Sequence, residues 1–253
     1  MAPAWLAFYD GIIALVLFVF GTSGAYFGFL NPFTGFQMAF VWSLLISVIG
    51  VIVGLYAQRR YRAPGFEALR RRATVGLWAS ALVLVPVLIL VARGMIAKVP
   101  PINDITTDFD NPPEFVAIES LPATAEFPMK YDKVKYADRQ LAGYGVLAPL
   151  KERGTAADTF AKVKEVAAQV PSWKIAYSDD ATMTLEGYST SKLFRFPDYF
   201  VIKVQPSSDG GSLIQMRSKS RYGIGDFGIN YRRIHNFFDR IALARENPGE
   251  EIP

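Results

Sequence analysis

Cysteine is absent from the 253 residues, and histidine occurs once, as His235. Without cysteine the chain has neither a disulfide framework nor thiolate ligands for a metal. The single histidine follows the apolar Ile234, and we expect it on the surface of a helix. No serine is marked by a histidine and acid pair, so nucleophilic hydrolysis has no support. We therefore assign no catalytic residue, no cofactor and no metal.

Charge is also absent from a long segment: no charged residue occurs from Gly11 to Gln58. At about 1.5 Å per residue a single helix of that length would be over twice the roughly 30 Å hydrocarbon core. We therefore expect two spans joined by a turn at 31–35, and a further apolar run supplies a third. The predicted spans are about 12–29, 36–56 and 74–96. Thr74 to Ala92 is uncharged and Arg93 can reach the interface, so no charge inside the membrane marks a transport path, which argues against a channel or a carrier.

Two features of the first span have alternative interpretations. A cleaved signal peptide is the competing reading, but no cation precedes the apolar run, Asp10 does, and a second span follows directly. The small residues Gly21, Gly24 and Gly28 let another helix backbone approach closely. That helix is either the second span or part of a second copy of the chain.

Six arginines lie in the short segment between the second and third predicted spans: Arg59, Arg60, Arg62, Arg70, Arg71 and Arg72. Cationic loops of this length stay in the cytoplasm, so the amino terminus is expected there and the chain after the third span on the far side. The cluster serves either as a topology determinant in contact with lipid headgroups or as a site that recruits lipid or a partner.

The arginine loop also explains the formal net charge of +4, because the rest of the chain is nearly balanced. A nucleic-acid-binding domain needs its basic excess on a folded surface, so nucleic acid is excluded as a partner. The lipid bilayer is the expected partner, together with a membrane protein or a second copy. We divide the chain into a membrane domain (1–98), an extended lead-in (99–135) and an outer domain (136–253).

The lead-in begins with a segment rich in proline and acids. Its carboxylates Asp104, Asp108, Asp110 and Glu114 suggest calcium, but the spacing lacks the central glycine and terminal glutamate of an EF-hand loop. Local turns closed by aspartate are the other interpretation.

The outer domain is predicted to be α+β, with the order helix, four strands, helix. Thr155 and Asp158 form a capping box for a helix that Pro171 stops. Strands are expected from Trp173, from Met183, over 194–204 and over 213–221, joined by short links typical of an antiparallel sheet. The last helix carries Ile234, Phe237, Phe238 and Ile241. Two helices cover one face of such a sheet and leave the other for water or a partner.

The stretch Gln215 to Ile241 joins the last predicted strand to the last helix. Alternation places Arg217, Lys219 and Arg221 on one face, which is expected to be basic and hydrated. We expect the arginines to face Glu186 and Asp198. One interpretation is a structural polar network, and the other is an anion pocket built on glycine-exposed amides near the helix start. The candidate residues are Glu186, Asp198, Arg217, Ser218, Arg221, Gly223, Asp226, Asn230 and Arg233.

These residues resemble the bacterial and plastid family known as domain of unknown function 1499. The resemblance runs from Asn103 to Ile241 and excludes the three spans. It is carried by Asn103-Asp104-Ile105, Pro112-Pro113, Gln140 with Tyr144, Trp173, Glu186, Phe196 with Asp198, Arg217-Ser218-Lys219-Ser220-Arg221, Gly223, Asp226, Gly228, Asn230 and Arg233-Ile234. The resemblance implies the fold and a bacterial envelope setting, here the inner membrane with a periplasmic outer domain. It implies no activity.

Three classes of function follow from the sequence. The first is a non-catalytic accessory subunit or scaffold of an envelope complex. The second is a binding module for an anionic ligand or lipid headgroup at the Arg217–Arg233 turn. The third is an enzyme, for which the sequence offers no catalytic constellation.

Overall fold

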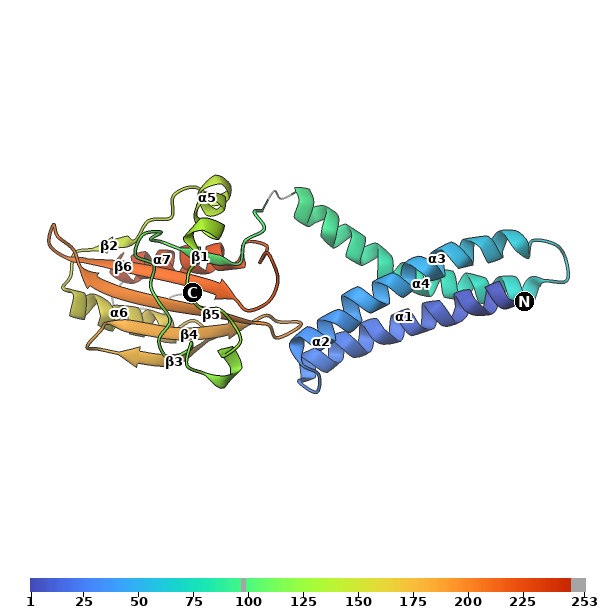
Figure 1. Ribbon diagram of the computed structural model, residues 1–253, viewed down its shortest axis with the longest axis horizontal. Helices are drawn as coiled ribbons and strands as arrows, with labels where there is room; N and C mark the ends of the chain where they lie inside the picture. Colours follow the sequence, from blue (N-terminus) through green and yellow to red (C-terminus); the bar gives the residue numbers. More distant parts are fainter. Residues whose placement is uncertain (97–98, 247–253) are drawn as a thin grey trace. The chain divides into compact units, whose positions relative to one another are not determined.

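The computed structural model describes residues 1–96 and 99–246, which form two compact units (Figure 1). We call them the membrane unit and the α+β unit. The first contains helices α1 to α4, and the second contains every described strand and the remaining helices. Residues 97–98 and 247–253, which fall in the expected membrane and outer domains, lie outside the described residues.

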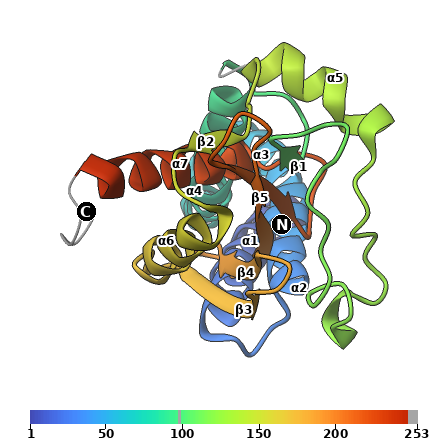
Figure 2. The same cartoon turned by 90° about the vertical axis from the view of Figure 1, so that its left-hand side faces the viewer.

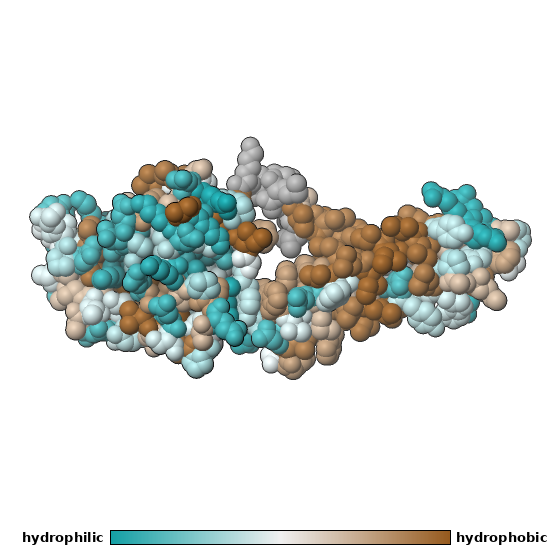
Figure 3. Space-filling model, in the orientation of Figure 1, coloured by the Kyte–Doolittle hydropathy of each residue, from teal (hydrophilic) through white to brown (hydrophobic). Residues whose placement is uncertain are grey.

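The membrane unit has three segments that are long and apolar enough to cross a bilayer: Ala2–Phe27, Pro32–Arg60 and Glu67–Ile89. The first is α1 (Ala2–Phe27), and the third lies in α4 (Glu67–Ile96). The second joins α2 (Pro32–Phe36), a π-helical turn (Gln37–Trp42) and α3 (Ser43–Arg60). The prediction of three spans is therefore confirmed. Apolar residues form a brown surface over these helices, and polar residues gather where α3 joins α4 (Figure 3).

Glycines set the spacing of these helices. A Cβ atom on Gly76 of α4 would lie 2.0 Å from the carbonyl oxygen of Ala7, and one on Gly11 would lie 2.3 Å from that of Gly76. The backbones of α1 and α4 therefore touch with no side chain between them, as small residues allow in membrane helices. Gly21 faces the second span in the same way, because a Cβ atom on it would lie 2.6 Å from the carbonyl oxygen of Gly35.

Asp10 lies inside α1, because this helix begins at Ala2 and not near Ile12. The expectation that the spans carry no charge is therefore wrong for the first helix. Its Oδ2 atom is buried, with no hydrogen-bond partner among the described residues. A Cβ atom on Gly50 would lie 3.2 Å from the Cβ of Asp10 and 2.3 Å from Ser80 Oγ. The carboxyl group and this hydroxyl thus flank a gap that the glycine leaves.

The α+β unit contains one antiparallel sheet of six strands in the order β1-β6-β5-β4-β3, with β2 also paired to β6. The strands are β1 (Asp104–Thr106), β2 (Leu150–Glu152), β3 (Trp173–Asp179), β4 (Thr184–Thr190), β5 (Pro197–Pro206) and β6 (Ser212–Ser220). The other elements are a short turn η2 (Pro122–Thr124) and the helices α5 (Lys133–Tyr144), α6 (Ala156–Ala168) and α7 (Ile229–Glu246).

The predicted order of one helix, four strands and one helix is confirmed for α6, β3 to β6 and α7, but the sheet is larger. Strands β1 and β2 have three residues each, too few to show an alternating pattern. Strand β1 and helix α5 both come from the segment expected as an extended lead-in or left unassigned. The capping box is confirmed, since Thr155 Oγ1 accepts the Asp158 N–H at 3.1 Å.

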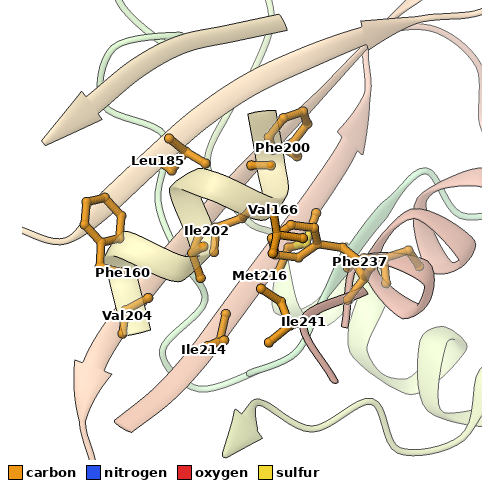
Figure 4. Packing of buried hydrophobic residues seen from close by; sticks show 14 of the residues in the cluster. Phe160, Val166, Leu185, Phe200, Ile202, Val204, Ile214, Met216, Phe237 and Ile241 are labelled. Carbon is orange, nitrogen blue, oxygen red and sulfur yellow. The ribbon is translucent and has the colours of Figure 1, made fainter. Parts of the chain in front are cut away.

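One face of the sheet carries the main core. Residues from alternate positions of β4, β5 and β6 meet side chains from α6 and α7 (Figure 4). Phe200, Ile202 and Met216 are fully buried there, and Ile234, Phe237 and Ile241 of α7 pack onto them as their helical spacing predicts. Two helices therefore cover this face, as expected.

The other face is covered as well, so the expectation of an open face is wrong. The segment 107–131, which we call the covering segment, crosses it on the side opposite α6 and α7 (Figure 2). Phe115, Ile118 and Met129 of this segment bury Tyr199 and Val201 of β5. The covering segment has little periodicity, because most of it is neither helix nor strand.

Candidate functional site

Strand β6 places the basic residues of the motif between two other strands. The register aligns Arg217 with Thr106 of β1 and Val201 of β5, and it aligns Lys219 with Asp104 of β1. Residues that pair directly across strands point to the same face of a sheet. Arg217, Lys219 and Asp104 therefore meet beneath the covering segment.

These three residues form a buried ionic cluster. Arg217 donates from Nε and Nη2 to the two carboxylate oxygens of Asp104 at 2.9 and 2.8 Å, and Lys219 Nζ donates to Asp104 Oδ2 at 2.8 Å. Arg217 and Asp104 are fully buried, and Lys219 is 4% exposed. Two parallel bonds of this kind are the strong geometry for arginine and a carboxylate.

Residues of the covering segment surround the guanidinium group of Arg217. Arg217 Nη2 also donates to the Met129 carbonyl at 2.6 Å, and its guanidinium lies 5.2 Å from the ring centroid of Phe115 and 5.3 Å from that of Tyr131. Burial lowers the pKa of Lys219, while the facing carboxylate of Asp104 opposes that shift. The expectation of a hydrated basic face is wrong, because residues 107–131 exclude water from it.

Glu186 has a different partner from the one predicted. Its carboxylate accepts the backbone N–H groups of Val116 at 2.5 Å, Ala117 at 3.2 Å and Ile118 at 2.8 Å. The side chain is fully buried on the same face as Arg217, since β4 aligns Glu186 with Val201. Glu186 therefore fixes the covering segment to the sheet through charge-assisted hydrogen bonds.

A second network lies on the helix-covered side of the sheet. Arg233 of α7 donates from Nη2 to Asp198 Oδ2 and to Ser189 Oγ, each at 2.8 Å. Its Nη1 donates to Ser218 Oγ at 2.7 Å and to Asn230 Oδ1 at 2.6 Å. These contacts tie the start of α7 to β4, β5 and β6.

Asp226 accepts hydrogen bonds from backbone amides near the helix start, which the sequence had suggested as part of an anion pocket. Its carboxylate accepts the N–H groups of Gly228 and Asn230, both at 2.8 Å, and so caps α7. Gly223 and Gly228 have φ values of 89° and 78°, which a residue with a side chain seldom adopts. Burial raises the pKa of Asp226, and the hydrogen bonds from the two amides oppose that shift. The carboxylate of the chain thus fills the place that an external anion would take.

The predicted residues therefore divide between two networks, one on each face of the sheet. Arg217 and Glu186 lie under the covering segment, whereas Asp198, Ser218, Asp226, Asn230 and Arg233 lie toward α7. Arg221 is half-buried, and its guanidinium lies 5.3 Å from the ring centroid of Tyr222. The predicted pairing of Arg217 and Arg221 with Glu186 and Asp198 is wrong, because Asp104 and Arg233 take those places.

The acids proposed for calcium do not converge. Asp104 serves the ionic cluster, Asp108 Oδ1 accepts the N–H groups of Asp110 and Asn111 at 2.9 Å, and Asp110 pairs with Lys133. No cluster of three or more histidine, aspartate or glutamate side chains suited to a metal occurs in residues 1–96 and 99–246. The observed contacts follow the alternative interpretation, in which aspartates close local turns.

The described part of the α+β unit has surface hollows, of which two bear on function. The larger, about 650 Å³, lies between the covering segment and the strands, and its lining includes Asp108, Glu114, Tyr177, Thr182, Lys203 and Gln205. The smaller, about 380 Å³, lies between α7 and the start of β3, and we call it the arginine groove. Its lining includes Trp173, Ile229, Arg232, Arg233, Asn236 and Arg240. The sequence did not lead us to predict this groove, although the spacing of residues 232, 236 and 240 places them on one side of a helix.

Taken together, the fold and site define an α+β domain with buried ionic networks, attached to helices suited to a membrane. Residues 104–241 match the model of the family described as proteins of unknown function (DUF1499). The match covers more than half of the chain, so the chain belongs to this family, as the resemblance of its motif residues indicated. A comparison with curated proteins gave no match.

Proposed function

We propose that the chain is a membrane-anchored, non-catalytic accessory subunit or scaffold of an envelope complex. The observation that carries this proposal is that most charged residues of the motif are buried and bonded to other charged residues or to backbone amides of the same fold. Arg217, Asp104 and Glu186 are each fully buried. Residues used in this way hold a fold together and cannot reach a substrate, so function falls to the exposed surfaces.

The burial of these charged residues also argues against the two other classes of function, an anion-binding module and an enzyme. An anion at the Arg217–Arg233 turn would have to displace Asp226 from the amides of Gly228 and Asn230. Catalysis would need a titratable group held in a cleft beside a reactive partner. His235, the single histidine, instead pairs with Asp239 on the exposed side of α7 at 3.0 Å.

We further propose that the chain resides in a bacterial inner membrane with its amino terminus in the cytoplasm and the α+β unit in the periplasm. The support is the arginine-rich loop between α3 and α4, which contains or borders Arg59, Arg60, Arg62, Arg70, Arg71 and Arg72. Short cationic loops are retained on the cytoplasmic side. An odd number of spans then places the two ends of the membrane unit on opposite sides.

Two exposed features offer a surface for a protein partner. The larger hollow combines the carboxylates of Asp108 and Glu114 with the ammonium of Lys203, so both signs of charge are available. Strand β3 is the last strand of the sheet path, and Ile175 on it is 41% exposed. An edge strand of this kind accepts a strand from another chain through backbone hydrogen bonds.

A photo-crosslinking amino acid placed at Thr182 or at Ile175 tests the proposal in living cells. We expect an adduct of discrete mass from at least one position, and the same partner should co-purify in stoichiometric amount with the unmodified chain in detergent. The crosslinker at Glu165, on the exposed side of α6, is the control. The proposal fails if the chain purifies without a partner and no position gives a discrete adduct.

A further inference from the structure

The loop between β6 and α7, residues 221–228, exposes large apolar side chains, and we call it the tip loop. Ile224 is 78% exposed and Phe227 is 63% exposed, and neither belongs to a hydrophobic cluster of the described residues. Ile229, which follows at the start of α7, is 39% exposed. Single exposed apolar residues are common on soluble proteins, whereas a group of them at one place marks an interaction surface.

The backbone of the tip loop is fixed, and at Phe227 it is held in an unfavourable conformation. Phe227 has a φ of 55°, in the left-handed region that a bulky side chain rarely adopts. Arg232 Nη1 donates to the Phe227 carbonyl at 3.0 Å, and the Asp226 carboxylate accepts the Gly228 N–H at 2.8 Å. Glycine at this position would avoid the strain. The fold therefore bears a cost at Phe227 that core burial does not offset.

The charges on and around the tip loop suit a lipid surface. Asp226 is the only acid in the sequence between Ser218 and Phe238, and it is 6% exposed. Arg221 and Arg232 border the exposed apolar residues, and both can keep their present contacts, because a lipid surface needs no free cation here. An apolar tip bordered by cations and without an exposed acid is typical of segments that enter the headgroup region of a bilayer.

The chain itself ties the tip loop to the last helix of the membrane unit. The Asp226 N–H donates to the Ile102 carbonyl at 3.2 Å, and a Cβ atom on Gly225 would lie 3.1 Å from the Cα of Pro101. Helix α4 ends at Ile96, five positions before Pro101. Five positions of a fully extended chain span at most about 18 Å. The tip loop is therefore kept near the end of α4, whatever the arrangement of the two units.

We propose that the tip loop inserts Ile224 and Phe227 into the headgroup region of the bilayer that holds the membrane unit. This contact limits the orientation of the α+β unit on the bilayer, and so it determines which of its surfaces a partner can reach. The inference rests on the proposed membrane anchoring, but it depends neither on the compartment nor on the scaffold role.

The test uses the absence of cysteine, because a single thiol can be placed at a chosen position of the full chain. Ile224→Cys is labelled with the fluorophore nitrobenzoxadiazole, and the chain is reconstituted in nanodiscs of phosphatidylcholine and phosphatidylglycerol. The lipids are used with and without a doxyl quencher near the headgroup end of the acyl chain. Leu88→Cys, at a position 53% exposed in the third candidate span, is the positive control. Ser208→Cys, in the exposed turn between β5 and β6, is the negative control.

We expect the doxyl lipid to quench the Ile224 probe at least about half as strongly as the Leu88 probe, and to leave the Ser208 probe unquenched. Phe227→Asn, combined with Ile224→Cys, removes one apolar anchor and keeps a residue that tolerates a positive φ. It should reduce the quenching at least about twofold. Ile175→Asn, which removes an exposed apolar residue from β3, is the matched control and should leave the quenching unchanged.

An Ile224 probe that emits as it does in water overturns the proposal. A probe that is shielded from water but not quenched by the lipid also overturns it, because protein, such as a second copy of the chain, then covers the tip loop. Equal effects of Phe227→Asn and Ile175→Asn have the same consequence. If the Leu88 probe escapes quenching, the membrane anchoring itself is contradicted, and this inference with it. The crosslinking test of the scaffold role is independent of these outcomes.

Discussion

The positive charge of Arg217 is fully buried, and removing it should lower the free energy of unfolding. Arg217→Met keeps most of the volume but leaves Asp104 with Lys219 alone and removes the bond to the Met129 carbonyl. Breaking a buried pair by removing one partner costs about 3–5 kcal/mol. We expect a fall of several degrees in the melting midpoint of the full chain in detergent, followed by circular dichroism.

Arg221→Met provides the matched comparison, because the same substitution is made four residues further on. Arg221 is half-buried, and its side chain contacts the Tyr222 ring and hydrogen-bonds Tyr199, but it is outside the two ionic networks described above. Its replacement should change stability by less than about 1 kcal/mol. Equal effects of the two substitutions would show that burial of the charge at Arg217 does not decide stability.

Tyr144 gives a prediction about alkaline pH. Burial, with a smaller contribution from the negative charge of Asp226, raises the pKa of its hydroxyl from 10.0 to about 12. The fold thus favours the neutral form, so this group has no effect on stability below pH 10 and lowers stability as pH rises from 10 toward 12. The hydroxyl has no hydrogen-bond partner among the described residues. Tyr144→Phe should match the parent at pH 7 and lose less stability at alkaline pH, measured by urea unfolding at each pH. A steeper alkaline loss in the variant would refute this.

At the scale of single residues, the sequence identified the polar residues of the motif, but it predicted their bonding partners less well. Asp104 and Arg217 are 113 positions apart, and no local pattern relates them. Glu186 accepts backbone amides, which carry no sequence signature at all. The cap by Asp226 was predictable because it acts within a few residues of its own helix start.

Among the elements, those with a regular period were predicted and those without one were missed. Helix α7 and strand β6 have clear periodicity over many residues, so their core faces could be identified. Strands β1 and β2 are three residues long and exist only because β6 pairs with them. The covering segment is shaped by Glu186 and by apolar contacts with β5. Its position therefore depends on tertiary structure.

The close approach of α1 and α4 makes an element-scale prediction. Gly76→Ile would place a branched side chain where a Cβ atom already lies 2.0 Å from the Ala7 carbonyl oxygen. The two helices must separate, at a cost of about 1–3 kcal/mol or more. We expect a lower melting midpoint and a lower yield of folded protein in detergent. Ala92→Ile, at an exposed position of the same helix, is the control and should leave both unchanged. An unaltered midpoint for the glycine variant would contradict the packing at this crossing.

At the scale of the whole molecule, the three candidate spans and the arginine loop are the features on which the proposed compartment of the α+β unit rests. Composition predicted the number of spans, since a long uncharged segment cannot fold in water without burying its apolar surface. It placed the start of the first span too late, because Asp10 is a poor residue for hydrocarbon and yet lies within α1.

The compartment of the α+β unit is the central claim of the proposed function, and the absence of cysteine makes it directly measurable. Ala63→Cys introduces a thiol in the exposed loop between α3 and α4, and Ser208→Cys introduces one in the exposed turn between β5 and β6. Bacterial spheroplasts expressing each variant are treated with a membrane-impermeant maleimide before and after permeabilisation. The parent chain, which has no thiol, gives the background. We predict that Ser208→Cys is labelled in intact spheroplasts and that Ala63→Cys is labelled only after permeabilisation. The opposite pattern would contradict the periplasmic assignment and, with it, the role proposed in the envelope.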